Sequence, residues 1–226
     1  MNIALLFEQS GTFKRVLQSK GHNAKDFDIC NDYNQTDYII DLFDYIDNTN
    51  MERINKADLV IAFYPCTWFS NQNDLLYSKH FYGFKTWDDE KINKYLDERL
   101  AMEKEMETRL LTLINKIKVP MIIENPNSRR ICKILKDYKS VLHKRSKYGD
   151  YFDKPTRYYL FNGVEIEPLD EIKNDIHMRV KYTSEAKSIQ GTRKMKRSMM
   201  SPLYVENLIN HITVKGEYLG NSYNEY

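Results

Sequence analysis

Two side chains with reactive groups follow apolar segments of the sequence. Cys66 comes directly after Pro65, beyond the run 59–63, and Glu124 follows the run 119–123. A cysteine behind a proline in a tight loop can present its thiolate to a cleft, although inert packing explains a buried cysteine equally well. A carboxyl group beside a thiolate suits addition to a pyrimidine, because sulfur attacks C6 while the protonated carboxyl group holds N3 and the exocyclic amine. The pair is therefore a candidate nucleophile and acid.

A second group of residues could hold a nucleoside-containing cofactor. Gly11 lies in a turn before a helical segment, and the N-terminus of a helix offers free backbone N–H groups to a ligand. Asp28 follows at the distance at which a second-strand carboxylate accepts hydrogen bonds from ribose hydroxyls. Asp41 could accept one from an amino group. Each residue alone fits an ordinary turn or solvated loop, whereas together they fit such a cofactor.

These residues need a scaffold in which several strands end at one edge. Apolar runs predict strands, and 3.6-residue periodicity predicts helices. The expected strands cover 1–7, 24–29, 38–41, 59–63, 119–123 and 158–161, and the expected helices cover 13–20, 88–118, a basic segment ending near 138, and 202–212. Strands that alternate with helices predict an α/β fold with an open, mostly parallel sheet. Ligands bind such sheets at the carboxyl ends of the strands.

Composition predicts one core and no membrane span. No apolar run approaches the roughly 20 residues that a span requires, and the N-terminus lacks the basic start and long apolar region of a signal peptide. The three cysteines are widely separated and odd in number, which argues against disulfides, and the five histidines lack metal-ligand spacing. We therefore expect a single domain over 1–226, a cytoplasmic location and no metal.

Charge is distributed unevenly along the chain. Residues 26–52 contain eight acidic residues and no Lys or Arg, whereas residues 129–157 contain ten basic residues against three acidic ones. Tyrosines lie between the basic residues, a mixture suited to phosphates and stacked bases. A solvated surface would give the same pattern. Nucleic acid is therefore an expected partner.

The residues around Cys66 and Glu124 resemble motifs of the cytosine-C5 DNA methyltransferases. The family's fourth-strand motif, Asp-Leu-Leu-Ile-Gly-Gly-Pro-Pro-Cys-Gln-Gly-Phe-Ser, is similar without a gap to residues 58–70, and its Glu-Asn-Val is similar to Glu-Asn-Pro at 124–126. Residues 7–13 resemble its first motif, 154–161 its Gln-x-Arg-x-Arg motif, and 197–203 the segment before its last helix. The chain thus resembles a small, phage-like member of the family.

This resemblance implies a fold, a cofactor and roles for individual residues. It implies the Rossmann-like sheet of the class I S-adenosylmethionine-dependent methyltransferases, and methyl transfer to C5 of cytosine in single- or double-stranded DNA through a covalent Cys66 adduct. The implied catalytic residues are Cys66, Glu124 and Arg157, of which Arg157 would steady the cytosine O2. The implied cofactor-binding residues are Phe7, Gly11, Thr12, Asp28, Asp41, Pro65 and Ser198. The expected nucleic-acid-binding residues are Ser70, Arg129, Arg130, Lys144, Arg145 and Lys154.

The sequence also departs from the family pattern. Gln9 stands where the first motif has a glycine, and only about 40 residues separate Arg157 from Arg197, so a short basic insert at about 165–196 replaces a recognition domain. Two other functions stay open: a methyltransferase-like protein that has lost catalysis and binds nucleic acid or a partner, and a methyltransferase acting on RNA or a free pyrimidine nucleotide. The aromatic-rich loop at 67–86 could close behind a flipped base or simply pack.

Overall fold

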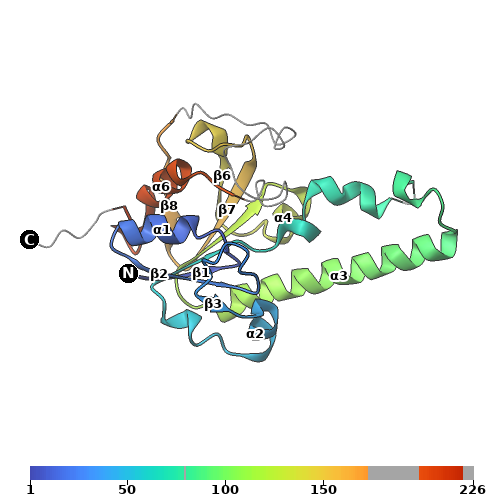
Figure 1. The fold of residues 1–226 in the computed structure, drawn as a ribbon, viewed down its shortest axis with the longest axis horizontal. Helices are drawn as coiled ribbons and strands as arrows, with labels where there is room; N and C mark the ends of the chain where they lie inside the picture. Colours follow the sequence, from blue (N-terminus) through green and yellow to red (C-terminus); the bar gives the residue numbers. More distant parts are fainter. Residues whose placement is uncertain (79, 173–198, 221–226) are drawn as a thin grey trace, which may run out of the picture.

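The protein has a mixed α/β fold built on one large sheet (Figure 1). The computed structural model describes residues 1–78, 80–172 and 199–220. The strands are β1 (Asn2–Leu6), β2 (Asn23–Asp28), β3 (Tyr38–Ile39), β4 (Leu59–Ala62), β5 (Met121–Pro126), β6 (Ser140–Lys144) and β7 (Pro155–Phe161). Their order is β3-β2-β1-β4-β5-β7-β6, and β7 runs in the opposite direction to the other six strands of this sheet. The expected open, mostly parallel sheet is confirmed.

Helices cover both faces of this sheet. They are α1 (Thr12–Ser19), α2 (Leu42–Asn48), α3 (Asp89–Lys116), α4 (Arg129–Ile134) and α6 (Pro202–Asn210). α1 and α6 pack together on one face, and α2 and α3 pack on the other (Figure 1). Side chains cap four of the five helices in the described residues: those of Asp41, Asp88, Ser128 and Ser201 accept backbone N–H groups that would otherwise lack a partner. Polar residues in the sequence thus decide where these helices begin.

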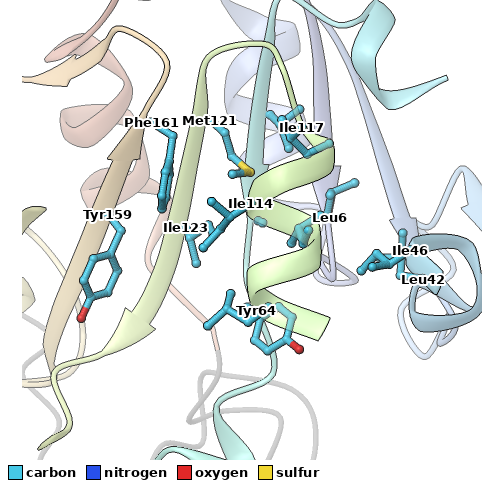
Figure 2. Close-up of a cluster of buried hydrophobic side chains, with 14 of the residues drawn as sticks. Leu6, Leu42, Ile46, Tyr64, Ile114, Ile117, Met121, Ile123, Tyr159 and Phe161 are labelled. Carbon is cyan, nitrogen blue, oxygen red and sulfur yellow. The ribbon is translucent and has the colours of Figure 1, made fainter. Parts of the chain in front are cut away.

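Strand alternation divides the core into two layers. Ile123 and Tyr159 lie on the α2/α3 face, in the cluster of buried side chains that Figure 2 shows, whereas Ile122 and Tyr158 lie on the α1/α6 face. Paired residues of β5 and β7 lie side by side on the same face of the sheet, Ile123 beside Tyr159 and Glu124 beside Tyr158. The same alternation decides which polar side chains at the strand ends can meet.

Helix α3 is longer than the sheet that it covers. Its 28 residues span about 42 Å at 1.5 Å per residue, and its N-terminal half extends away from the sheet beside the segment before it (Figure 1). The Arg99 guanidinium lies over the rings of Trp68, at 5.1 Å, and Tyr77, at 4.8 Å. The Phe84 ring contacts the ring of Tyr95, on α3, at 5.2 Å. Aromatic and cation–π contacts therefore hold the 66–87 segment against α3.

Several elements differ from the sequence-based expectation, among them helix α2, which was not expected. The basic helix ends at Ile134 rather than near 138, and the unexpected strand β6 follows it. β6 lies at the edge of the sheet, where it pairs only with β7 and exposes Leu142, so its sequence lacks the buried apolar run that predicts a strand. The expected irregular insert begins inside a small second sheet of β8 (Val164–Ile166), β9 (Ile212–Val214) and β10 (Glu217–Tyr218). Among the described residues, no helix is both long and apolar enough to cross a membrane.

Candidate active site

A cavity of about 400 Å³ lies at the carboxyl ends of β1, β2, β4 and β5. Its volume falls within the roughly 300–1,000 Å³ typical of small-molecule sites. The cavity forms here because each of these parallel strands is followed by a loop at the same edge of the sheet. Eight residues that the sequence singled out line it: Phe7, Thr12, Asp28, Asp41, Pro65, Cys66, Glu124 and Lys154. Cys66 and Glu124 thus share one cavity.

Cys66 begins a 3₁₀ turn directly after Pro65. The turn spans Cys66–Trp68, and the Cys66 carbonyl accepts hydrogen bonds from the N–H groups of Phe69, at 3.1 Å, and Ser70, at 3.0 Å. The cysteine is half-buried at the cavity wall. Asn125 fixes the approach to this turn, because its Nδ2 donates to the Tyr64 carbonyl at 2.8 Å. Asn125 is fully buried and was not singled out as a functional residue from the sequence.

Glu124 is a desolvated acid. Its side chain is buried, and its Oε1 has no hydrogen-bond partner among the described residues. Burial raises the pKa of Glu124 above its ordinary value, and the positive charges of Lys154 and Arg145 oppose that shift. A carboxyl group with a raised pKa keeps its proton at higher pH. Glu124 is therefore suited to donate a hydrogen bond into the cavity.

Arg157 does not join Cys66 and Glu124. It pairs with Asn125 across β5 and β7, which puts it on the opposite face of the sheet from Glu124. Its Nε donates to Asn127 at 3.0 Å and its Nη1 to Ser140 at 2.9 Å, in a separate pocket of about 230 Å³. The structure therefore does not bring Arg157 together with Cys66 and Glu124, as the resemblance implied. Successive strand residues alternate faces, so a motif aligned one residue out of phase assigns the wrong side.

Lys154 brings a positive charge to the cavity instead. It precedes β7, is half-buried and lies close enough to Glu124 to oppose the rise in that residue's pKa. It is the only basic side chain among the described residues that line the cavity. A residue expected to contact DNA thus lies near the candidate acid.

The other half of the cavity is formed by the loops after β1 and β2. Phe7 has a φ of 59°, an uncommon conformation for a bulky residue, and its ring contacts those of Phe43, at 5.4 Å, and Tyr64, at 5.5 Å. Gly11 precedes α1 with a φ of 68°, and a Cβ there would lie 2.9 Å from the Arg15 side chain and 3.0 Å from that of Gln35. Glycine is therefore required for the turn, although Gly11 itself does not line the cavity.

The two candidate aspartates are held in different ways. Asp28 is buried, its Oδ1 accepts the Cys30 N–H at 2.7 Å, and desolvation raises its pKa. Asp41 caps α2, accepting the N–H groups of Phe43 at 2.9 Å and Asp44 at 3.2 Å. Both line the cavity. Their carboxylates could accept hydrogen bonds from hydroxyl and amino groups of a nucleoside.

The candidate residues for nucleic acid are dispersed. Arg129 and Lys144 are exposed and Ser70 is half-buried, whereas Arg130 lies over the Tyr77 ring at 4.1 Å and pairs with carboxylates of neighbouring elements. The cofactor candidate Ser198 lies outside the described residues. No group of three or more His, Cys, Asp or Glu side chains in the described part of the chain could hold a metal ion.

Arg145, an expected nucleic-acid-binding residue, lies in the interior rather than at the surface. Arg145 is fully buried, forms an ion pair with Asp150 and donates from Nη2 to the Met199 carbonyl at 3.0 Å. Its guanidinium lies 5.6 Å from the Tyr204 ring centroid. A buried, paired guanidinium cannot reach a polynucleotide, and a basic run in a sequence does not reveal which of its members is buried.

No family model matches the chain, and no curated protein matches it. Similar solved structures include a protein described as a DNA modification methyltransferase encoded within a prophage in E. coli, which is 15% identical with a TM-score of 0.42 over 71% of this chain and 46% of that one. The Entamoeba histolytica methyltransferase EhMeth is 10% identical, with a TM-score of 0.46 over 81% and 59% of the two chains. The S. pombe Dnmt2 methyltransferase is 11% identical, with a TM-score of 0.41 over 84% and 55%. This chain thus spans about half the length of each.

Proposed function

We propose that this protein is an S-adenosylmethionine-dependent DNA cytosine-C5 methyltransferase whose nucleophile is Cys66. One observation carries the proposal: a single cavity contains Cys66, the buried acid Glu124 and the nucleoside-type candidates Asp28 and Asp41. A nucleophile and a protonated acid on one wall suit attack on a pyrimidine, and carboxylates on the other wall suit a nucleoside cofactor. These two ligand types are what methyl transfer to cytosine requires.

The residues around the loop after β1 fit S-adenosylmethionine. Phe7 offers an aromatic face held by two neighbouring rings, Asp28 and Asp41 offer acceptors for ribose and adenine, and α1 begins at the cavity wall with Thr12. When bound, S-adenosylmethionine supplies an electrophilic methyl group next to the base. We assign Pro65 and Thr12 to the walls that separate this cofactor from the loops behind it.

The chain's own groups account for activation of the cytosine. Cys66 adds as the thiolate, and its Sγ forms a bond to C6 while Glu124 gives its proton to N3. Electron density displaced from the C5–C6 double bond then makes C5 nucleophilic, and C5 takes the methyl group as the sulfonium S–CH3 bond breaks and leaves a neutral thioether. Loss of the C5 proton to solvent restores the double bond and expels Cys66 as the thiolate, and the N3 proton returns to Glu124. Lys154, the only basic side chain among the described residues lining the cavity, is in our proposal the cation that faces the base carbonyl O2.

DNA is the acceptor that we propose. Arg129 and Lys144 are exposed cations suited to phosphates, and a base inside the cavity would have to leave the helical stack. RNA and a free pyrimidine nucleotide offer the same ring to Cys66. A transfer assay with tritiated S-adenosylmethionine and each of DNA, RNA and dCMP distinguishes them, and label in RNA or dCMP but not DNA would refute our choice of acceptor.

Trapping of the covalent adduct tests the role of Cys66. DNA containing 5-fluorocytosine should form a stable adduct with the wild type, because fluorine at C5 prevents the final proton loss. Cys66→Ser should form no adduct and lose activity on the order of 10³-fold or more. Cys132→Ser is the matched control, because this cysteine contacts Asn127 and Tyr159 in the separate pocket. An equally active Cys66→Ser variant would refute the mechanism, and absence of transfer to every acceptor would favour a protein that only binds.

A further inference from the structure

Glu8 is a buried carboxylate in the cavity that sequence motifs did not single out. It follows Phe7 at the end of β1, is 5% exposed and lines the same cavity as Cys66. Its Oε1 accepts a hydrogen bond from the Ser10 hydroxyl, and its Oε2 accepts one from the Gly11 N–H at 2.9 Å. Both oxygens act as acceptors, as those of an ionised carboxylate do. The loop before α1 therefore fixes the carboxyl group of Glu8 inside the cavity.

Acidic side chains predominate in the part of the cavity that we assign to the cofactor. Glu8, Asp28 and Asp41 all line it, and Lys154 is the only basic side chain among the described lining residues. Burial raises the pKa of Glu8 above its ordinary value, and the hydrogen bonds from Ser10 and Gly11 only partly oppose this rise. A positively charged ligand would favour the ionised form further, since opposite charges attract strongly where water is excluded. The cavity is thus matched to a cation.

Substrate and product of methyl transfer differ by one positive charge. S-adenosylmethionine carries a sulfonium, whereas S-adenosylhomocysteine carries a neutral thioether of nearly the same shape. We propose that Glu8 is a specificity-determining residue that favours the sulfonium form of the cofactor over the demethylated product. This inference rests on the proposed function, and it adds a means of product release: transfer of the methyl group removes the charge that Glu8 attracts.

A purely structural role for Glu8 makes a different prediction. The hydrogen bonds to Ser10 and Gly11 hold the loop before α1, so a carboxylate that only shaped this loop would affect both ligands equally. Glu8→Gln keeps the shape and an acceptor oxygen but removes the charge. The ratio of the two dissociation constants therefore separates an electrostatic role from a structural one.

The test is isothermal titration calorimetry at pH 8 with S-adenosylmethionine, S-adenosylhomocysteine and sinefungin, in which an amine replaces the methylated sulfonium. We expect Glu8→Gln to weaken binding of the two cationic ligands about tenfold relative to S-adenosylhomocysteine. The matched control is Glu165→Gln, which removes an exposed carboxylate on β8 outside the cavity and should leave all three constants unchanged.

The outcomes separate this inference from the proposed function. Equal weakening of all three ligands by Glu8→Gln, or no weakening at all, overturns the role of Glu8 while the cofactor assignment stands. Failure of the wild type to bind S-adenosylmethionine refutes the proposed function, and this inference with it. A selective loss for the cationic ligands supports both.

Discussion

Replacing Glu124 by Gln should make the protein more stable at neutral pH while it removes activity. Burial raises the pKa of Glu124 above its ordinary value of 4.5, so the folded state holds this proton more tightly than the unfolded chain does. Between the two pKa values the unfolded state binds fewer protons, and the free energy of unfolding therefore falls as pH rises. The side-chain amide of the Glu124→Gln variant cannot ionise, so the variant escapes this loss.

The magnitude follows from linkage. Above pH 4.5, the stability of the variant relative to the wild type should grow by up to about 1.4 kcal/mol per pH unit, and the growth should stop at the folded-state pKa. Transfer activity should fall on the order of 10²–10⁴-fold, because the amide can occupy the site of the acid but cannot give a proton to N3. Stability and activity thus change in opposite directions.

Urea unfolding followed by tryptophan fluorescence, at several pH values from 4 to 8, measures this difference, and the tritium-transfer assay measures activity. Glu165→Gln is again the control, since it removes an exposed carboxylate and should change stability by less than about 0.5 kcal/mol. A stability difference that stays constant across the pH range would show that Glu124 is not a desolvated acid. Full activity of Glu124→Gln would show that no proton is needed from it.

Other expected results concern the basic residues near the cavity. Lys154→Met should lower kcat/KM roughly 10–100-fold, because it removes the cation from the cavity. Arg157→Met, on the opposite face of the sheet, should change kcat/KM less than about threefold. A larger loss of transfer activity for Arg157→Met than for Lys154→Met would show that Arg157 acts in the site. Arg145→Met should lower the free energy of unfolding by about 3–5 kcal/mol because it leaves Asp150 buried without its partner. Urea unfolding should then show partial recovery in an Arg145→Met/Asp150→Asn double variant, and equal loss in both would contradict the ion-pair explanation.

Much of the scaffold could be predicted from the sequence. Local periodicity and apolar runs indicate β1, β2, β4 and α3, because each buries a continuous stripe or run of its own side chains. Edge strand β6 and the end of α4 could not be predicted this way. β6 is stabilised by pairing with β7, a segment more than ten residues away. The local sequence around β6 does not indicate this pairing.

The position of a site residue could be predicted where the residue directly follows a strand. It could not be predicted where the face of the sheet to which the side chain points depends on strand register. Local sequence is enough to place Cys66 and Glu124 just beyond or at the end of two strands, and a parallel sheet then brings them to one cavity. Long-range pairing and packing were needed to establish that Arg157 faces away, that Arg145 is buried and that Glu8 turns into the cavity. The difference arises because strand ends are fixed by local hydrophobic pattern, whereas the face that a side chain takes and the burial of a charge depend on contacts with distant segments.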